Sequence, residues 1–391
     1  MSLHNNRITP IVSPFKPTSS IDTWILIATL VLVMIGLISV YSVTMNLGIS
    51  YLKNQAIRII IGLVAMIIGF AIPYKLYEGK TKDIILIITI FLLILTLIFG
   101  RKVAFARRWA LFFQTAEFAK YSLIIWLSGY FANLKEKQRK IELKKNLIKS
   151  FPYFPLFTVV VIIGLLLLQP AIGTSFILAI SSLCLFFIVG VRLKHILLIS
   201  TISIVLFVVS ILTIPYAKSR FEKFCQGITY QQRQSRIAIG SGGIIGVGLG
   251  EGKQKLHFLP KAHTDFIFSA FAEETGLIGS LIMLSLFFVL FMRGFKIAAQ
   301  TNDFFGQYLV LGISIMLFLY VLVHLAVALK LMPTTGQPLP FISYGGSALV
   351  SNLFAVGIIL NISKYRRNTY ENGIYHRRRN WRTYLPKYRD W

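Results

Sequence analysis

Acidic residues are scarce in this chain. Asp and Glu together number 14 among 391 residues, against 41 Lys and Arg, which leaves a formal net charge of +27. Charged residues of both signs make up 14% of the sequence, whereas soluble globular domains carry about 25%. Because 55% of the residues are hydrophobic, the composition excludes an ordinary soluble domain and favours a protein embedded in a lipid bilayer.

Cysteine is almost absent as well, since Cys184 and Cys225 are the only two. Two isolated thiols give no disulfide framework. The chain also lacks the short segments of alternating polar and apolar residues that are typical of a membrane β-barrel. A helical membrane protein remains, because helices and closed barrels are the structures that satisfy the backbone inside a bilayer.

Apolar blocks near the ~20 residues needed to cross the hydrocarbon core recur along the chain. We predict an all-α polytopic membrane protein with about ten transmembrane helices and a large extracytoplasmic loop, residues 215–264, between helices 7 and 8. A segment 1–22 precedes this membrane domain 23–363, and a basic tail 364–391 follows it. The predicted helices are 23–43, 55–72, 83–99, 115–133, 152–168, 173–191, 195–214, 265–292, 305–328 and 346–363.

Lys and Arg set the predicted orientation. The loop 135–149, KEKQRKIELKKNLIK, and the tail 364–391 are strongly basic, and such segments stay in the cytoplasm. An even number of helices places both termini there. We expect the tail to meet anionic lipid headgroups rather than nucleic acid, because a basic cluster beside a membrane helix is usually a lipid contact.

The segments 100–114, 215–264 and 329–345 fall on the outer side, yet they carry positive charge. Arg107 and Arg108 stand in the first of them. This charge opposes the topological preference, so it indicates either that an anionic group is handled outside or that the overall surplus spills over. Composition alone leaves both readings open.

Three of the few acids stand within ten positions, at Asp265, Glu273 and Glu274. Ionisable groups beside a bilayer are costly and usually functional. Asp265 is the best candidate for a catalytic base at the water–membrane boundary. His263 is predicted to orient the substrate or share a proton, although a hydrogen-bonded loop histidine fits the pattern too. Glu273 and Glu274 are predicted to be supporting residues, one of which pairs with an Arg or caps a loop.

Two segments, one rich in glycine and one rich in proline, are candidates for binding an anion. Glycines crowd into residues 240–252, where successive amides can form an anion-binding nest, although a flexible re-entrant segment is as good an interpretation. The stretch Leu331–Ser347, LMPTTGQPLPFISYGGS, holds three prolines that forbid a continuous helix, so it lines a cavity or forms a structural turn. The candidate substrate-binding residues in and beside these segments are Gln234, Ser241, Gly242, Gly243, Lys255, Pro338, Ser343, Tyr344, Gly345, Gly346 and Ser347.

A third constellation is Arg107–Lys120, RRWALFFQTAEFAK. Arg107, Arg108 and Lys120 complete the candidate substrate-binding set. Glu117 and Lys120 are three residues apart and are spaced to pair on one helix face. A structural ion pair inside the bundle is the favoured interpretation of these two.

Together these motifs resemble the SEDS family of membrane glycosyltransferases, named for shape, elongation, division and sporulation. The resemblance rests on ARRW, FQTAEFAK, YQQRQSRIAIGSGG, GVGLGEGKQK, LPKAHTDFIF followed by EETGLIG, and PTTGQPLPFISYGGS, in this order along nearly the whole chain. Ala262 before His263 and the wording of the last motif look more like the division branch, FtsW, than the elongation branch, RodA. FtsW often has Glu where His257 and Lys261 stand, so a second acid near the proposed base is missing here.

The resemblance implies a polymerase of peptidoglycan glycan strands that acts in septal wall synthesis, in the bacterial cytoplasmic (inner) membrane. The implied substrate is lipid II, a disaccharide-pentapeptide on undecaprenyl pyrophosphate. A sugar 4-hydroxyl attacks C1 of the growing strand, the lipid pyrophosphate leaves, and the anomeric centre inverts. Asp265 would accept the hydroxyl proton, and the outer arginines, Lys120 and the glycine segments would hold the pyrophosphate.

Implied partners are lipid II, a class B penicillin-binding protein transpeptidase, and other membrane proteins of the divisome or elongasome. No metal-ligand set is assigned, and a divalent cation, Mg or Mn, is the one cofactor left open. Two alternatives remain, a RodA-type elongation polymerase and a lipid II flippase or transporter. Transporters often contain internal repeats, and none is visible in this sequence.

Overall fold

The computed structural model describes residues 20–366 apart from 104–105, 111–112, 141–152, 228 and 257. For residues 101–103 and 106–110 the backbone alone is described. The segment 1–19, His257 and the tail from residue 367 therefore lie outside the described residues.

The ten predicted helices all have counterparts, and the predicted fold class is confirmed. They are α1 (Thr23–Thr44), α2 (Ile49–Ala71), α3 (Lys80–Phe99), α4 (Thr115–Lys140), α5 (Tyr153–Leu168), α6 (Ile172–Val189), α7 (Leu193–Thr213), α10 (Ile267–Gln300), α11 (Phe304–Ala328) and α12 (Gly346–Ser363). Eight of the described helices are long and apolar enough to cross a membrane, and α5 is apolar but shorter. Large side chains such as Ile60, Phe91 and Leu212 remain more than half exposed, as lipid-facing residues do. The chain is a multi-pass membrane protein.

The connection between α7 and α10 is more ordered than a loop. It contains α8 (Pro215–Cys225) and α9 (Tyr230–Ser241). Pro215 stands in the first turn of α8, where its missing amide hydrogen costs nothing. Helix α10 begins at Ile267 rather than at Asp265, and it runs to Gln300, beyond the predicted end at residue 292.

A small antiparallel sheet lies between α3 and α4. Its strands are β1 (Arg101–Val103), β2 (Ala106–Ala110) and β3 (Phe113–Gln114), in the order β1-β2-β3. The second strand carries Arg107 and Arg108, whose side chains are not described.

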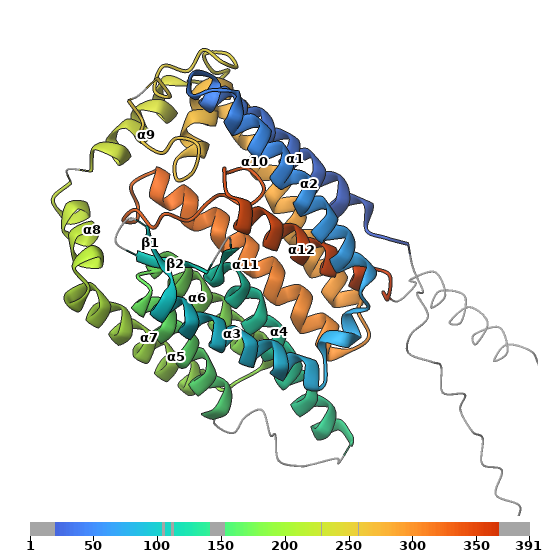
Figure 1. Ribbon diagram of the computed structural model, residues 1–391. Helices are drawn as coiled ribbons and strands as arrows, with labels where there is room; N and C mark the ends of the chain where they lie inside the picture. Colours follow the sequence, from blue (N-terminus) through green and yellow to red (C-terminus); the bar gives the residue numbers. More distant parts are fainter. Residues whose placement is uncertain are drawn as a thin grey trace, which may run out of the picture.

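The connections gather at two ends of the bundle. We call the end with residues 20–22, 72–79, 301–303 and 364–366 the termini end, and the end with residues 100–114, 214–266 and 329–345 the loop end. Figure 1 shows α8, α9 and the strands on the left, with the first and last described residues on the right. Candidate chemistry from the sequence is concentrated at the loop end.

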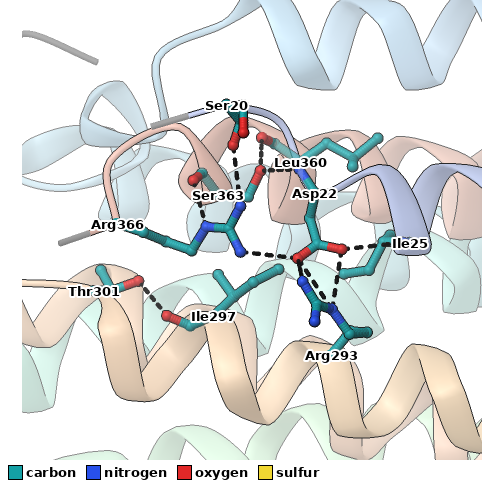
Figure 2. Close-up of polar contacts among 9 residues, drawn as sticks. All are labelled: Ser20, Asp22, Ile25, Arg293, Ile297, Thr301, Leu360, Ser363 and Arg366. Atoms are coloured by element: carbon teal, nitrogen blue, oxygen red, sulfur yellow. Dashed lines mark hydrogen bonds and ion pairs between the residues drawn. The ribbon is translucent and has the colours of Figure 1, made fainter. Parts of the chain in front are cut away.

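A buried carboxylate joins the helices at the termini end. Asp22 caps α1 by accepting a hydrogen bond from the amide of Ile25. The same carboxylate, fully buried, accepts hydrogen bonds from Arg293 on α10 and from Arg366 after α12. Figure 2 shows both guanidinium groups around it, with the Asp22 amide bonded to Ser363 Oγ. The start of α1 is therefore held against the ends of α10 and α12.

Glycines bring α2 and α12 into backbone contact. A Cβ atom at Gly69 would lie 2.5 Å from the carbonyl oxygen of Phe354, and one at Gly357 would lie 2.2 Å from that of Met66. Small residues permit such close approach between membrane helices. This contact fixes α12, and hence the segment leading into it, against α2.

Candidate active site

Asp265 lies in a turn just before α10. Its amide donates a hydrogen bond of 3.1 Å to the carbonyl oxygen of Lys261, whose φ is +59°. The Asp265 side chain is 16% exposed, and its Oδ2 lies 3.9 Å from Lys261 Nζ. The carboxylate is thus partly shielded from water while keeping an access path.

A guanidinium group faces the same space as this carboxylate. A Cβ atom placed on Gly336 would lie 3.8 Å from Asp265 Oδ2 and 3.7 Å from Arg220 Nη1. Arg220 is held in place by a hydrogen bond of 2.6 Å to the carbonyl oxygen of Thr334 and by the ring of Tyr216. The absence of a side chain at Gly336 therefore leaves a point within 4 Å of both an acid and a permanent cation.

His263 belongs to an aromatic cluster. Its ring centroid lies 5.7 Å from those of Tyr51 and Tyr344, which are 5.5 Å from each other. The guanidinium carbon of Arg58, on α2, lies 4.1 Å from the Tyr344 ring centroid. Burial lowers the pKa of His263, Asp265 opposes that effect, and Lys261 adds to it. His263 is therefore a neutral imidazole at neutral pH.

Two hydrogen bonds join the segment before Asp265 to the proline-rich segment. Ser343 Oγ donates to the carbonyl oxygen of Thr264 at 2.8 Å, and the Tyr344 amide donates to that of His263 at 2.9 Å. Ser343 Oγ also accepts from the amide of Leu339. Ser343 therefore links the two predicted motifs, and its hydroxyl both donates and accepts a hydrogen bond within the protein.

The N-terminus of α12 opens beside this cluster. Its N-cap residue, Gly345, provides no capping side chain. Ser347 Oγ accepts a hydrogen bond from the amide of Gln114, which ties the small sheet to α12. A Cβ atom on Gly346 would lie 3.3 Å from the Arg58 side chain. Gln55, one turn before Arg58 on α2, is fully buried, and neither polar atom of its side chain has a hydrogen-bond partner among the described residues.

The predicted pair of Glu117 and Lys120 is present inside the bundle. Lys120 Nζ lies 2.6 Å from Glu117 Oε2, and both side chains are almost fully buried. Asn352 Oδ1 accepts from Lys120, and Ser351 Oγ donates to Glu117. The ring of Tyr320 covers the ammonium group at 4.4 Å. Lys120 thus has a full set of protein partners in this conformation.

The glycine-rich segment 240–252 is held against α10 by backbone hydrogen bonds. The amides of Val247 and Gly248 donate to the carbonyl oxygens of Glu273 and Glu274, and the amide of Leu277 donates to that of Gly243. Helix α10 is interrupted here at Gly276, whose φ is +66°. Because the amides of Val247 and Gly248 already donate hydrogen bonds to α10, they do not form an open anion-binding nest.

The two glutamates of α10 have partners within the protein. Glu273 accepts from the amides of Lys253 and Gln254, so it caps the loop. Glu274 pairs with Lys255 at 2.7 Å and accepts from Ser42. The partner of Glu274 is therefore a lysine, and Lys255 is buried against it.

The structure brings together only part of the predicted set. Asp265, His263, Ser343, Tyr344, Gly345, Gly346 and Ser347 lie in one region, with Pro338 against Gly345. Four other predicted residues belong to a different segment. Gln234 and Ser241 lie on α9, where the Ser241 hydroxyl donates to the carbonyl oxygen of Ala238. Gly242 packs against Ala272 of α10, and Gly243 follows Gly242 in the chain. Sequence reasoning missed Arg220, Gly336, Arg58, Tyr51 and the buried His324, whose Nδ1 lies 3.0 Å from the Gln337 carbonyl oxygen.

Within the part of the chain that the structure describes, no three His, Cys, Asp or Glu side chains form a metal-ligand set. The charged neighbours of the Asp265 carboxylate are the ammonium group of Lys261 and, across the point beside Gly336, the guanidinium group of Arg220, and both repel a divalent cation. These residues do not fit the divalent cation that the sequence left open, and no step below is assigned to one.

Comparison with known proteins places these features in context. The model of the FtsW, RodA and SpoVE cell cycle protein family matches residues 18–368. The probable peptidoglycan glycosyltransferase FtsW of Trichlorobacter lovleyi is 37% identical, over 90% of this chain and 94% of its own length. The protein of the same name from Geobacter metallireducens is 35% identical, over 90% and 97%. A chain from a peptidoglycan synthase complex that coordinates polymerization and crosslinking superposes with a TM-score of 0.73, at 25% identity, over 89% of this chain and 99% of that one.

Proposed function

The chain belongs to the FtsW, RodA and SpoVE family of cell cycle proteins, and on that basis we propose how it works as a peptidoglycan glycosyltransferase. It polymerises glycan strands from lipid II in septal wall synthesis, by an inverting glycosyl transfer at the loop end. Asp265 is the general base of that transfer. The placement of Arg220 and Asp265 around the open point beside Gly336 supports this assignment.

The reaction needs a base at the acceptor oxygen. Asp265 Oδ2 takes the proton of the acceptor 4-hydroxyl while that oxygen forms its bond to C1 of the donor sugar. The bond from C1 to the lipid pyrophosphate breaks on the opposite face, so the configuration at C1 inverts. A positioned base of this kind contributes roughly 10²–10⁴-fold to a rate.

The leaving pyrophosphate needs positive charge. Arg58 and the uncapped amides at the N-terminus of α12 supply that charge, because a helix N-terminus favours anions. Arg220 lies on the side of Asp265, where its guanidinium group, directed by its bond to Thr334, holds the acceptor sugar beside the base. His263, neutral and in edge-to-face contact with two tyrosines, positions the turn that carries Asp265.

We place the loop end outside the bacterial inner membrane and the termini end in the cytoplasm. The described starts of the two basic stretches, residues 135–140 at the end of α4 and 364–366 after α12, lie at the termini end, in accord with the positive-inside rule. The basic tail, which lies outside the described residues, would contact anionic lipids there.

A class B penicillin-binding protein is the proposed partner. The solved complex that superposes on this chain coordinates polymerization and crosslinking, and a transpeptidase would supply the crosslinking activity. Other membrane proteins of the division machinery would join the same assembly.

The deciding experiment is lipid II polymerisation by the full chain purified in detergent, with and without the transpeptidase. Asp265→Asn should abolish glycan strands while the thermal melting profile stays that of the wild type. Glu222→Gln, at a carboxylate 52% exposed on α8, is the matched control and should retain full activity. Undiminished polymer from Asp265→Asn would remove the proposed base. Movement of lipid II between leaflets without polymer from the wild type would favour a flippase instead.

A further inference from the structure

A positively charged groove lies at the loop end, apart from the point beside Gly336. Its walls are Gly227 in the α8–α9 connection, Arg233, Arg236 and Ile237 on α9, and Lys330 after α11. It encloses about 440 Å³. We call it the α9 groove.

The cations of the α9 groove have no acidic partner in the part of the chain that the structure describes. Arg233 and Arg236 are exposed, one helical turn apart, and neither forms an ion pair with a described carboxylate. Lys330, with φ +61°, extends its ammonium group to the carbonyl oxygen of Gly227 at 3.0 Å. On neighbouring α8, by contrast, Lys218 lies 3.9 Å from Glu222. Three like charges around one hollow repel each other, so an anion that enters it is attracted.

The α9 groove and the active site are joined by the segment that follows α11. Gln232, on the same helix as the two arginines, donates through Nε2 to the carbonyl oxygens of Val327 and Met332. Two residues farther on, the carbonyl of Thr334 accepts the hydrogen bond from Arg220, and Gly336 follows beside Asp265. The connection from Lys330 to Gly336 thus leads from the groove to the base.

We propose that the α9 groove binds carboxylate groups of the peptide carried by the glycan strand. The proposal rests on the proposed function, in which each disaccharide bears a pentapeptide with at least a terminal carboxylate. Guanidinium groups recognise carboxylates through paired hydrogen bonds. The groove is open to water, where a peptide must lie while the sugars occupy the site, and its volume suits a few residues of extended chain. Arg233 and Arg236 are then positioning residues that hold the strand in register for the next transfer.

The test compares the double variant Arg233→Gln/Arg236→Gln with the wild type, as full chains in detergent. Steady-state polymerisation is measured with lipid II and with lipid II whose peptide carboxylates have been converted to amides. The double variant should raise KM for ordinary lipid II about tenfold and leave kcat unchanged, because charge-assisted contacts made equally in ground and transition states change binding alone. The wild type with amidated lipid II should show the same rise, and combining the two changes should add nothing. Lys223→Gln, which removes an exposed lysine of α8, is the control and should match the wild type.

An unchanged KM in the double variant would overturn the proposal. An equal loss on ordinary and amidated lipid II would overturn it too, because the groove would then bind phosphate or another anion. A wild type that makes no strands at all would instead refute the proposed function, so the two failures are distinct.

Discussion

The hydroxyl of Ser343 donates a hydrogen bond of 2.8 Å to the main-chain oxygen of Thr264. This bond spans two segments far apart in the sequence, and it fixes the residue immediately before Asp265. Because Ser343 Oγ also accepts from the Leu339 amide, one buried hydroxyl satisfies groups on both segments.

Ser343→Ala should therefore lower both stability and activity. It leaves a donor and an acceptor without partners, at a cost of about 1–3 kcal/mol, and it loosens the turn that carries the base. We expect a lower melting temperature in detergent and a fall in kcat with little change in KM. Ser285→Ala, at an exposed hydroxyl on α10, is the control. A wild-type kcat in Ser343→Ala would show that Asp265 does not depend on this bond.

Arg220 tests whether a fixed cation beside Asp265 contributes to the transfer. Arg220→Gln removes the charge and should reduce kcat/KM about 10²-fold, the scale of losing one preorganised electrostatic group. Arg220→Lys keeps the charge without the planar fork and should fall in between. Lys218→Gln, 57% exposed on the same helix, should be neutral in the lipid II assay. Equal rates for the Lys and Gln variants would mean that the Arg220 charge does not act on the transfer.

Most of the helices could be predicted because a long apolar run decides them, whereas α4 carries the buried Glu117–Lys120 pair and is not one of the apolar spans. The division into ten helices needed no tertiary information, and Asp265 stood out because acids are so rare. The helices α8 and α9 were missed as helices because they are short and polar, so no membrane criterion finds them. Lys255 was predicted from the sequence to bind substrate, yet in the structure it is buried against Glu274 and Ser42 from separate helices.

The convergence of Arg220, Gly336 and Asp265 could not be read from the sequence. Arg220 lies on α8, Asp265 in the turn before α10 and Gly336 in the segment after α11. Their approach depends on how α8 folds back over the segment after α11. Arg58 was missed for a similar reason, since it looks like an isolated charge in a membrane helix until Tyr344 is placed over it. Sequence patterns predict the elements, whereas the packing of polar connections determines the site.

The buried pair of Glu117 and Lys120 allows its structural and functional roles to be separated. Removing one partner strands a buried charge, which costs about 3–5 kcal/mol. Lys120→Met and Glu117→Gln should each be strongly destabilised, whereas the double variant should recover most of the melting temperature. If Lys120 also touches the substrate, the double variant will fold but not polymerise lipid II. Recovery of activity together with stability would restrict Lys120 to a structural role.

Asp22 should be the most sensitive carboxylate at the termini end. Asp22→Asn leaves the guanidinium groups of Arg293 and Arg366 without their shared anion and should cost about 3–5 kcal/mol. The matched comparison is Glu222→Gln, whose exposed pair with Lys218 is worth about 0–1 kcal/mol. Unfolding midpoints in detergent measure both. Similar small losses in the two variants would contradict the role of Asp22 as the joint between α1, α10 and α12.

His263 predicts a pH dependence of stability. Burial lowers its pKa below the usual value of 6.5, so the unfolded chain binds the proton more tightly than the folded one. The stability contributed by the neutral ring is complete above pH 6.5, and it is lost as the pH falls from there through the lowered folded pKa. Melting temperatures of the wild type should therefore fall between about pH 7.5 and about pH 5.5, more steeply than those of His263→Phe, which keeps an aromatic ring between Tyr51 and Tyr344 but cannot be protonated. Parallel pH profiles for the two proteins would show that another titratable group causes the loss of stability at low pH.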